Sequence, residues 1–214
     1  MTDNGKIMKD QVFLLYLGVT LVCAFSVMAS YDTSVWIMES APAFIGLFFL
    51  LSLTAKGVRL PAFLHAVFVF HAFVLVIGGI FSYPRVPFFN PDDFLGQTLG
   101  WTRNNYDKLG HFMQGFTPYL ACRQLLVAKG VTHRGAFPMF LAVSVSMAVS
   151  AVYELIEYAT LIYSVESAED FVGAQGDPYD TQKDILWAFI GALTAMVLWF
   201  RYKWRNIPRI SVES

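Results

Sequence analysis

Charged residues are scarce in this chain: lysine, arginine, aspartate and glutamate together make up 14% of its 214 residues. Soluble globular domains carry about 25% charged residues, because their surfaces must face water. The scarcity therefore excludes an ordinary soluble domain and a disordered chain. The formal net charge is −1 at pH 7, which excludes the strongly basic surface that nucleic-acid binding requires.

Cysteine is also rare, and the two examples are Cys23 and Cys122. Both lie within apolar runs, so neither a disulfide framework nor a CxxC site follows from them. The sequence contains no P-loop, GxGxxG fingerprint, GxSxG elbow or HExxH helix. These absences leave no common nucleotide-binding or hydrolase motif to carry a function.

Apolar residues are what the chain has in abundance, with 56% hydrophobic and 16% aromatic side chains. A helix needs about 20 mostly apolar residues to cross a hydrocarbon core of about 30 Å. We therefore predict an all-α membrane protein, a six-transmembrane-helix bundle that forms a single polytopic domain over residues 1–214, with five spans as the alternative. The predicted spans are residues 11–29, 35–54, 60–81, 109–127, 136–163 and 184–200.

The positive charges in the loops predict the orientation of these spans, because cytoplasmic loops are enriched in lysine and arginine. With the N-terminus inside, the cytoplasmic segments contain eleven of the fifteen basic residues: Lys6, Lys9, Lys56, Arg59, Arg123, Lys129, Arg134, Arg201, Lys203, Arg205 and Arg209. The outer side keeps Arg85, Arg103, Lys108 and Lys183. We therefore predict cytoplasmic termini and a location in the bacterial cytoplasmic (inner) membrane.

Three polar clusters interrupt the apolar second half of the chain, at residues 106–111, 153–158 and 173–184. The predicted topology puts the start of the fourth helix, the end of the fifth and the start of the sixth on the outer side. Within each cluster the acidic or histidine side chains are three or four residues apart, so they share a helical face. The pairs are Asp107 with His111, Glu154 with Glu157, and Asp180 with Asp184.

Carboxylates inside a membrane are costly, at about 2.5–3.5 kcal/mol each on insertion scales. Two of them on one face also repel, and a divalent cation between them removes both problems. Carboxylates with an imidazole suit Mg, Mn, Ca or Zn. The predicted metal ligands are Asp107, His111, Glu154, Glu157 and Asp184.

A metal at this site would activate water or polarise a phosphoryl or carbonyl group. The candidate general bases are Asp177, Asp180 or a glutamate that holds no metal. Basic residues of the same clusters could bind an anionic head group: Arg103, Lys108 and Lys183. The expected partners are membrane lipids and a lipid-linked envelope substrate, and nucleic acid is not expected.

Each residue also has a structural interpretation. The aspartates Asp107, Asp180 and Asp184 could cap helices, because aspartate favours such positions. His111 could be a hydrogen-bonded interior histidine, and the two glutamates could pair with the nearby basic residues. His65 and His71, in the third predicted span, are interpreted as packing or snorkelling residues.

The motifs YDKLGHF at 106–112, ELIE at 154–157 and GAQGDPYDTQKD at 173–184 resemble the YjdF family of bacterial inner membrane proteins, a multi-pass group of unknown function. A more remote similarity is to VanZ-like membrane proteins, which are associated with resistance to glycopeptides such as teicoplanin. The matching residues are Asp107, Lys108, His111, Glu154 or Glu157, Asp184 and Gly191. The asparagine expected in the last helix is missing, and the similarity implies no established reaction.

Three functions therefore stay open at the level of sequence. The first is a metal-dependent membrane hydrolase or transferase. The second is a proton- or cation-coupled transporter, which would need polar residues that continue toward the cytoplasmic side. The third is a non-catalytic scaffold in which the polar clusters lock the last three helices together.

Overall fold

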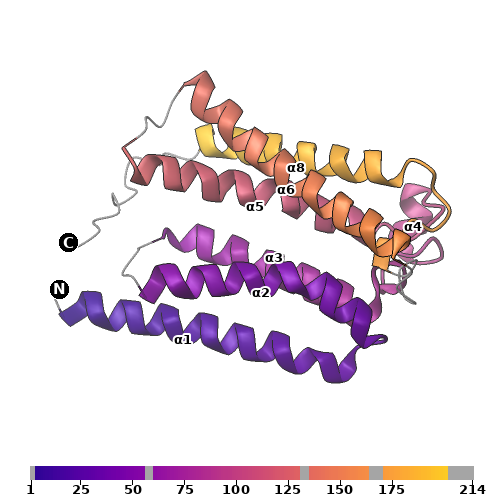
Figure 1. Ribbon diagram of the computed structural model, residues 1–214, viewed down its shortest axis with the longest axis horizontal. Helices are drawn as coiled ribbons and strands as arrows, with labels where there is room; N and C mark the ends of the chain where they lie inside the picture. Colours follow the sequence, from indigo (N-terminus) through magenta and orange to yellow (C-terminus); the bar gives the residue numbers. More distant parts are fainter. Residues whose placement is uncertain (1–2, 56–59, 131–134, 164–170, 202–214) are drawn as a thin grey trace.

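The computed structural model of the protein describes residues 3–55, 60–130, 135–163 and 171–201, and these residues form helices, turns and loops without a strand. Figure 1 shows the long helices side by side in one bundle. The elements are α1 (Asp3–Phe25), η1 (Ser26–Ala29), α2 (Thr33–Ala55), α3 (Ala62–Phe81), η2 (Tyr83–Arg85), α4 (Phe94–Leu99), α5 (Tyr106–Ala128), α6 (Ala136–Ile162) and α8 (Asp180–Arg201).

Five segments are long and apolar enough to cross a membrane: Asp10–Ala29, Thr33–Ala55, Ala62–Phe81, Ala136–Ile162 and Asp180–Arg201. They confirm the predicted all-α membrane class. The fourth predicted span corresponds to α5, which has 23 residues but is not among the five. Its sequence is polar along its length, because it contains the charges of Asp107, Lys108 and Arg123.

The predicted boundaries agree with the structure to within a few residues at most helix ends. The largest differences are at two N-termini. Helix α1 begins at Asp3, although its apolar span begins at Asp10, next to the predicted residue 11, and α8 begins at Asp180 rather than at residue 184. Both extra stretches are polar, so hydropathy alone did not include them.

The long helices form two groups of three. α2 packs against α1 and α3, while α5, α6 and α8 pack against one another, and α3 joins the groups by packing on α5. In Figure 1 the first group lies below the second. The beginning of α1 and the end of α8 lie at the same end of the bundle in both ribbon views.

The helices α5 and α8 approach each other closely. A Cβ atom on Gly115 would collide with the backbone of Ala188, and one on Gly191 would collide with the backbone of Phe112. Small residues let helix backbones approach in membranes, where packing rather than the hydrophobic effect drives association. The glycines thus fix α8 directly against α5, which aligns the polar residues at their N-terminal ends.

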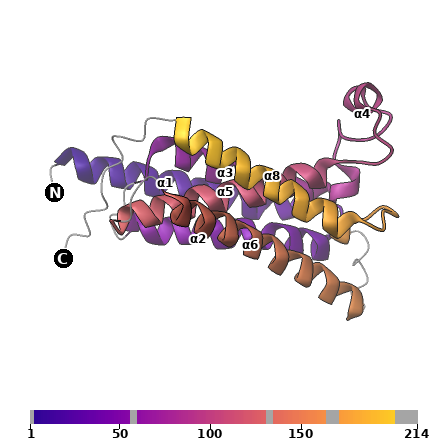
Figure 2. The ribbon, with the colours of Figure 1, turned by 90° about the horizontal axis from the view of Figure 1, so that it is seen from above.

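Side chains accept hydrogen bonds from backbone N–H groups at the beginning of α2 and of α5. Asp32 accepts hydrogen bonds from the backbone N–H groups of Ser34 and Val35 at 2.7 and 2.9 Å, and so caps α2. The Asn104 side chain accepts one from Tyr106 N–H at 2.9 Å, at the start of α5. Figure 2 shows α4 beyond the long helices, at the end of the bundle where α5 begins.

Candidate functional site

The three polar clusters of the sequence meet at one end of the bundle, which we call the polar end. It is the end at which α5 begins, α6 ends and α8 begins, as Figure 1 shows. Seven side chains from these helices are buried there: Asp107, Lys108, His111, Glu154, Glu157, Asp180 and Asp184. The convergence predicted from the spacing of the clusters is therefore present in the structure.

Lys108 lies at the centre of this group. Its Nζ atom is 2.7 Å from Asp184 Oδ1, 3.0 Å from Asp180 Oδ1 and 3.2 Å from Asp107 Oδ2. The three aspartates also lie close enough together to hold a metal ion, but the ammonium group already contacts each of them. Lys108 is therefore a counterion for carboxylates on two helices.

Arg103, in the loop before α5, has a similar role. Its guanidinium donates to Asp180 Oδ1 at 2.6 Å, to the Ala174 carbonyl at 2.9 Å and to the carboxylate of Asp107. Burial lowers the pKa of Arg103, but the carboxylates of Asp107 and Asp180 outweigh it, so the pKa is raised from its ordinary value. Arg103 thus ties the loop before α8 to the start of α5.

A second group consists of His111, Glu154 and Asp184, one residue from each of the three helices. His111 Nδ1 is 3.7 Å from Glu154 Oε1, and His111 Nε2 is 3.7 Å from Asp184 Oδ1. One ligand atom from each residue lies within 4.8 Å of the others.

Among the described residues, the polar end has more acidic side chains than lysine and arginine side chains. The carboxyl groups of Asp107, Asp180 and Asp184 contact the two basic side chains Arg103 and Lys108. Glu154 adds a fourth buried acid beside His111 and Asp184. A buried excess of negative charge requires bound protons or a cation. The group of His111, Glu154 and Asp184 has the oxygen and nitrogen ligands that such a cation would use.

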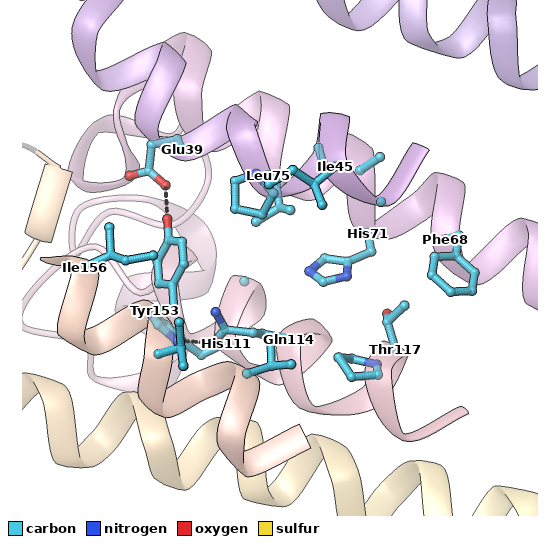
Figure 3. Close-up of a pocket in the computed structure, with 18 of the residues that line it drawn as sticks. Glu39, Ile45, Phe68, His71, Leu75, His111, Gln114, Thr117, Tyr153 and Ile156 are labelled. Carbon is cyan, nitrogen blue, oxygen red and sulfur yellow. Dashed lines mark hydrogen bonds between the residues drawn. The ribbon is translucent and has the colours of Figure 1, made fainter. Parts of the chain in front are cut away.

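Glu157 is separate from both groups, although it lies one turn beyond Glu154. Its side chain lines a cavity of about 670 Å³ between the two helix groups, together with His111 and Tyr153. Figure 3 shows the cavity, with His111 and Gln114 along one side and Leu75 and Ile45 across from them. His111 therefore belongs both to the group with Glu154 and Asp184 and to the wall of the cavity.

Glu39 on α2 is a buried acid that the sequence reasoning missed. It accepts a hydrogen bond from Tyr153 Oη at 3.2 Å, drawn as a dashed line in Figure 3, and it lines the same cavity. The available signal was a lone glutamate within an otherwise apolar span. The spacing of the three polar clusters did not predict Glu39, because α2 is remote in sequence from the other acids.

Asp177 and Lys183 lie at the rim of the polar end and pair with each other. The Lys183 side chain is half exposed, so this pair faces the surface. A hydrogen bond from Lys183 and a second from the Tyr179 N–H group hold the pKa of Asp177 below its ordinary value. The Asp177 carboxylate is also 3.7 Å from Arg103.

Comparison with known proteins identifies relatives but no described chemistry. The model of a family described as "Predicted membrane protein (DUF2238)" matches residues 11–205. Inner membrane protein YjdF of Escherichia coli (strain K12) is 38% identical over 198 residues, which are 92% of this chain and 92% of that protein. No solved structure matches the chain.

These findings confirm the YjdF-like resemblance and the multi-pass membrane class. The relative is named as an inner membrane protein, which agrees with the predicted location of this chain in the inner membrane. The similarity to VanZ-like proteins stays a prediction.

Proposed function

This chain belongs to the DUF2238 family of predicted membrane proteins, and we propose that it holds a divalent metal ion inside the membrane and uses it for hydrolysis or group transfer on a lipid-linked substrate of the cell envelope. The observation that carries the proposal is the group of His111, Glu154 and Asp184. These three buried side chains come from three different helices, and they adjoin an excess of negative charge.

The proposed ligands are those three residues. Their ligand atoms lie within 4.8 Å of one another. Small side-chain rotations would therefore let all three atoms reach a zinc ion placed between them, at zinc-to-ligand distances of about 2.0–2.2 Å. Asp107 and Glu157, the other two predicted ligands, have different surroundings. Asp107 is engaged with Arg103 and Lys108, and Glu157 faces the cavity.

The proposed chemistry assigns the remaining residues by their contacts. A bound metal would polarise a carbonyl or phosphoryl group or activate a water molecule. Glu157 is the candidate general base, because it faces the cavity in which a substrate would lie. Asp177 and Asp180, the two bases predicted from the sequence, instead pair with basic side chains.

The three basic residues that the sequence predicted to bind an anionic head group instead pair with carboxylates of the protein. Arg103 and Lys108 hold carboxylates, and Lys183 holds Asp177 at the rim. Their charges are therefore balanced by carboxylates within the protein, and their proposed role is to hold these carboxylates in place. The described residues that line the cavity include no lysine or arginine that could bind an anionic head group.

The proposed topology has six spans with both termini in the cytoplasm. With its 23 residues α5 measures about 35 Å, enough to cross a hydrocarbon core of about 30 Å. It packs on α3, α6 and α8, which are long and apolar enough to span, so its polar residues are covered by protein. The excess of basic residues in the predicted cytoplasmic loops supports the orientation.

The test of the metal site is elemental analysis of the detergent-purified protein after incubation with zinc, manganese or magnesium. We expect one metal ion per chain in the native protein and its loss from Glu154→Gln. Glu157→Gln is the matched control: it makes the same change one turn away on α6 and should retain the metal. Circular dichroism and gel filtration of each variant establish that it folds.

A native protein that binds none of these metals would refute the proposal. Equal metal content in Glu154→Gln and the native protein would refute the ligand assignment. If Glu154→Gln fails to fold while Glu157→Gln folds, His111→Gln serves as the second ligand variant.

A proton- or cation-coupled carrier is the second candidate, supported by the buried polar residues that continue along α5. Gln114, Thr117 and Gln124 follow His111 toward the opposite end of the bundle. Flux of protons into liposomes that contain the protein and a pH-sensitive dye would favour this function. Absence of flux together with bound metal would favour the enzyme.

A further inference from the structure

The cavity between the two helix groups has two unlike sides. One wall is the face of α5 that carries His111, Gln114 and Thr117, and Figure 3 shows these residues opposite His71 of α3. Most of the other lining side chains are apolar and come from α2, α3 and α6. The volume of about 670 Å³ lies in the range of about 300–1,000 Å³ that is usual for small-molecule sites.

The apolar side of the cavity lies at the outer surface of the bundle, between α2 and α6. α2 packs against α1 and α3, while α6 packs against α5 and α8, and the cavity lies between them. Four apolar residues line it and are also 43–70% exposed: Ile45 and Phe49 on α2, Val152 and Ile156 on α6. Both helices are long and apolar enough to span the membrane, so this rim meets lipid.

Two polar side chains on opposite walls of the cavity need a partner. Thr117 is buried, and its Oγ1 atom has no hydrogen-bond partner among the described residues. The buried Nε2 atom of His71 likewise has none within the described part of the chain. Buried polar groups without partners destabilise a fold, so a ligand with oxygen atoms would satisfy both.

The charges of the cavity limit the kind of ligand. Among the described residues that line it, the ionisable acids are Glu39, Asp107 and Glu157, and there is no lysine or arginine. An anionic head group would meet these acids and would find no lysine or arginine to pair with among the described residues that line the cavity. Hydroxyl, ester or ketone oxygens can instead accept hydrogen bonds from threonine and histidine.

We infer that this cavity binds a membrane lipid with an uncharged, oxygen-bearing head group. The head group lies against Thr117 and His71, and its hydrocarbon chain leaves between α2 and α6 into the bilayer. The inference rests on the proposed function and names the substrate class of that site, because His111 belongs both to the cavity wall and to the proposed metal ligands.

Two classes of lipid share this chemistry: glycerides and isoprenoid alcohols. The test therefore uses photoactivatable diacylglycerol and photoactivatable polyprenol, each with the reactive group in a hydrocarbon chain. Photoactivatable phosphatidic acid is the anionic control. The protein is reconstituted in vesicles of phosphatidylethanolamine and phosphatidylglycerol, illuminated, digested and analysed by mass spectrometry.

We expect one of the uncharged probes to crosslink to peptides of α2 or α6 that contain Ile45 or Val152, and to do so more than phosphatidic acid does. The probe that crosslinks identifies the source. Preferential crosslinking of phosphatidic acid, or equal crosslinking of all three probes, would overturn the inference.

Gly46→Trp blocks the cavity, because Gly46 lines it and a Cβ atom there meets no other atom within 4 Å. Gly18→Trp is the matched control, since Gly18 on α1 is equally unobstructed and lies outside the cavity lining. Crosslinking should be lost in Gly46→Trp and kept in Gly18→Trp. Thr117→Val, which removes the hydroxyl at nearly constant volume, should weaken crosslinking of the uncharged probe.

Metal analysis of the same variants separates this inference from the proposed function. Gly46→Trp should lose the lipid and retain the metal, whereas Glu154→Gln should lose the metal and retain the lipid. Crosslinking that survives in Gly46→Trp overturns the lipid site alone. A native protein without metal that still crosslinks overturns the metal site alone.

Discussion

The ion pairs at the polar end should differ in how much each stabilises the folded protein. Lys108 is buried and contacts three carboxylates from two helices, whereas Lys183 is half exposed and contacts one. A buried charge that loses its partner remains unsolvated, so breaking a buried pair costs far more than breaking an exposed one. The two lysines therefore provide a matched comparison.

We expect Lys108→Met to lower the free energy of unfolding by about 3–5 kcal/mol, because it leaves Asp107, Asp180 and Asp184 without their shared cation. Unfolding by sodium dodecyl sulfate, followed by circular dichroism, measures the change. Lys183→Met is the control and should change stability by about 0–1 kcal/mol. Equal effects of the two substitutions would contradict the structural role of Lys108.

At the scale of elements, the position of α8 against α5 decides whether the site exists. His111 is on α5 and Asp184 is on α8, so the separation of these helices sets the distance between the two side chains. Gly115 and Gly191 allow that separation, since any Cβ atom there collides with backbone atoms of the facing helix. Backbone atoms cannot move aside as a flexible side chain can.

We expect Gly191→Leu to push α8 away from α5, to destabilise the protein by about 1–3 kcal/mol or more, and to lower its metal content. Detergent unfolding and elemental analysis measure the two effects. Gly18→Leu should change neither, because a Cβ atom at Gly18 meets open space. A Gly191→Leu protein with native stability and metal content would show that the close approach is dispensable.

At the scale of the whole molecule, the order of the helices gives the bundle its sidedness. The beginning of α1 and the end of α8 lie at one end, and α4 and the polar end lie at the other. Six crossings would place these two ends on opposite sides of the membrane. Cysteine labelling can test this arrangement in a background in which Cys23 and Cys122 are replaced by alanine.

In that background, Leu99→Cys at the end of α4 should react with a membrane-impermeant maleimide added to intact spheroplasts. Lys129→Cys, just after α5, should react only after the membrane is opened. Both positions are exposed in the structure, so burial does not explain a failure to react. Labelling of both from the same side would exclude α5 as a membrane-spanning helix.

The sequence by itself determined the membrane class, the approximate bounds of the long helices and the positions of the polar clusters along them. These properties are local: hydropathy depends on about 20 consecutive residues, and a shared helical face depends on separations of three or four. The sidedness of the loops then predicted that the clusters around Asp107, Glu154 and Asp184 would meet, and they do.

Only the tertiary structure decided which of these residues face one another. It placed Lys108 between three aspartates, turned Glu157 into the cavity and added Glu39 and His71 from helices outside the three clusters. Such contacts depend on how helices far apart in the chain pack and rotate against each other. The periodicity of a single helix does not contain that information. Which helices become neighbours depends on how their facing surfaces fit, as where Gly115 and Gly191 let α5 and α8 approach closely.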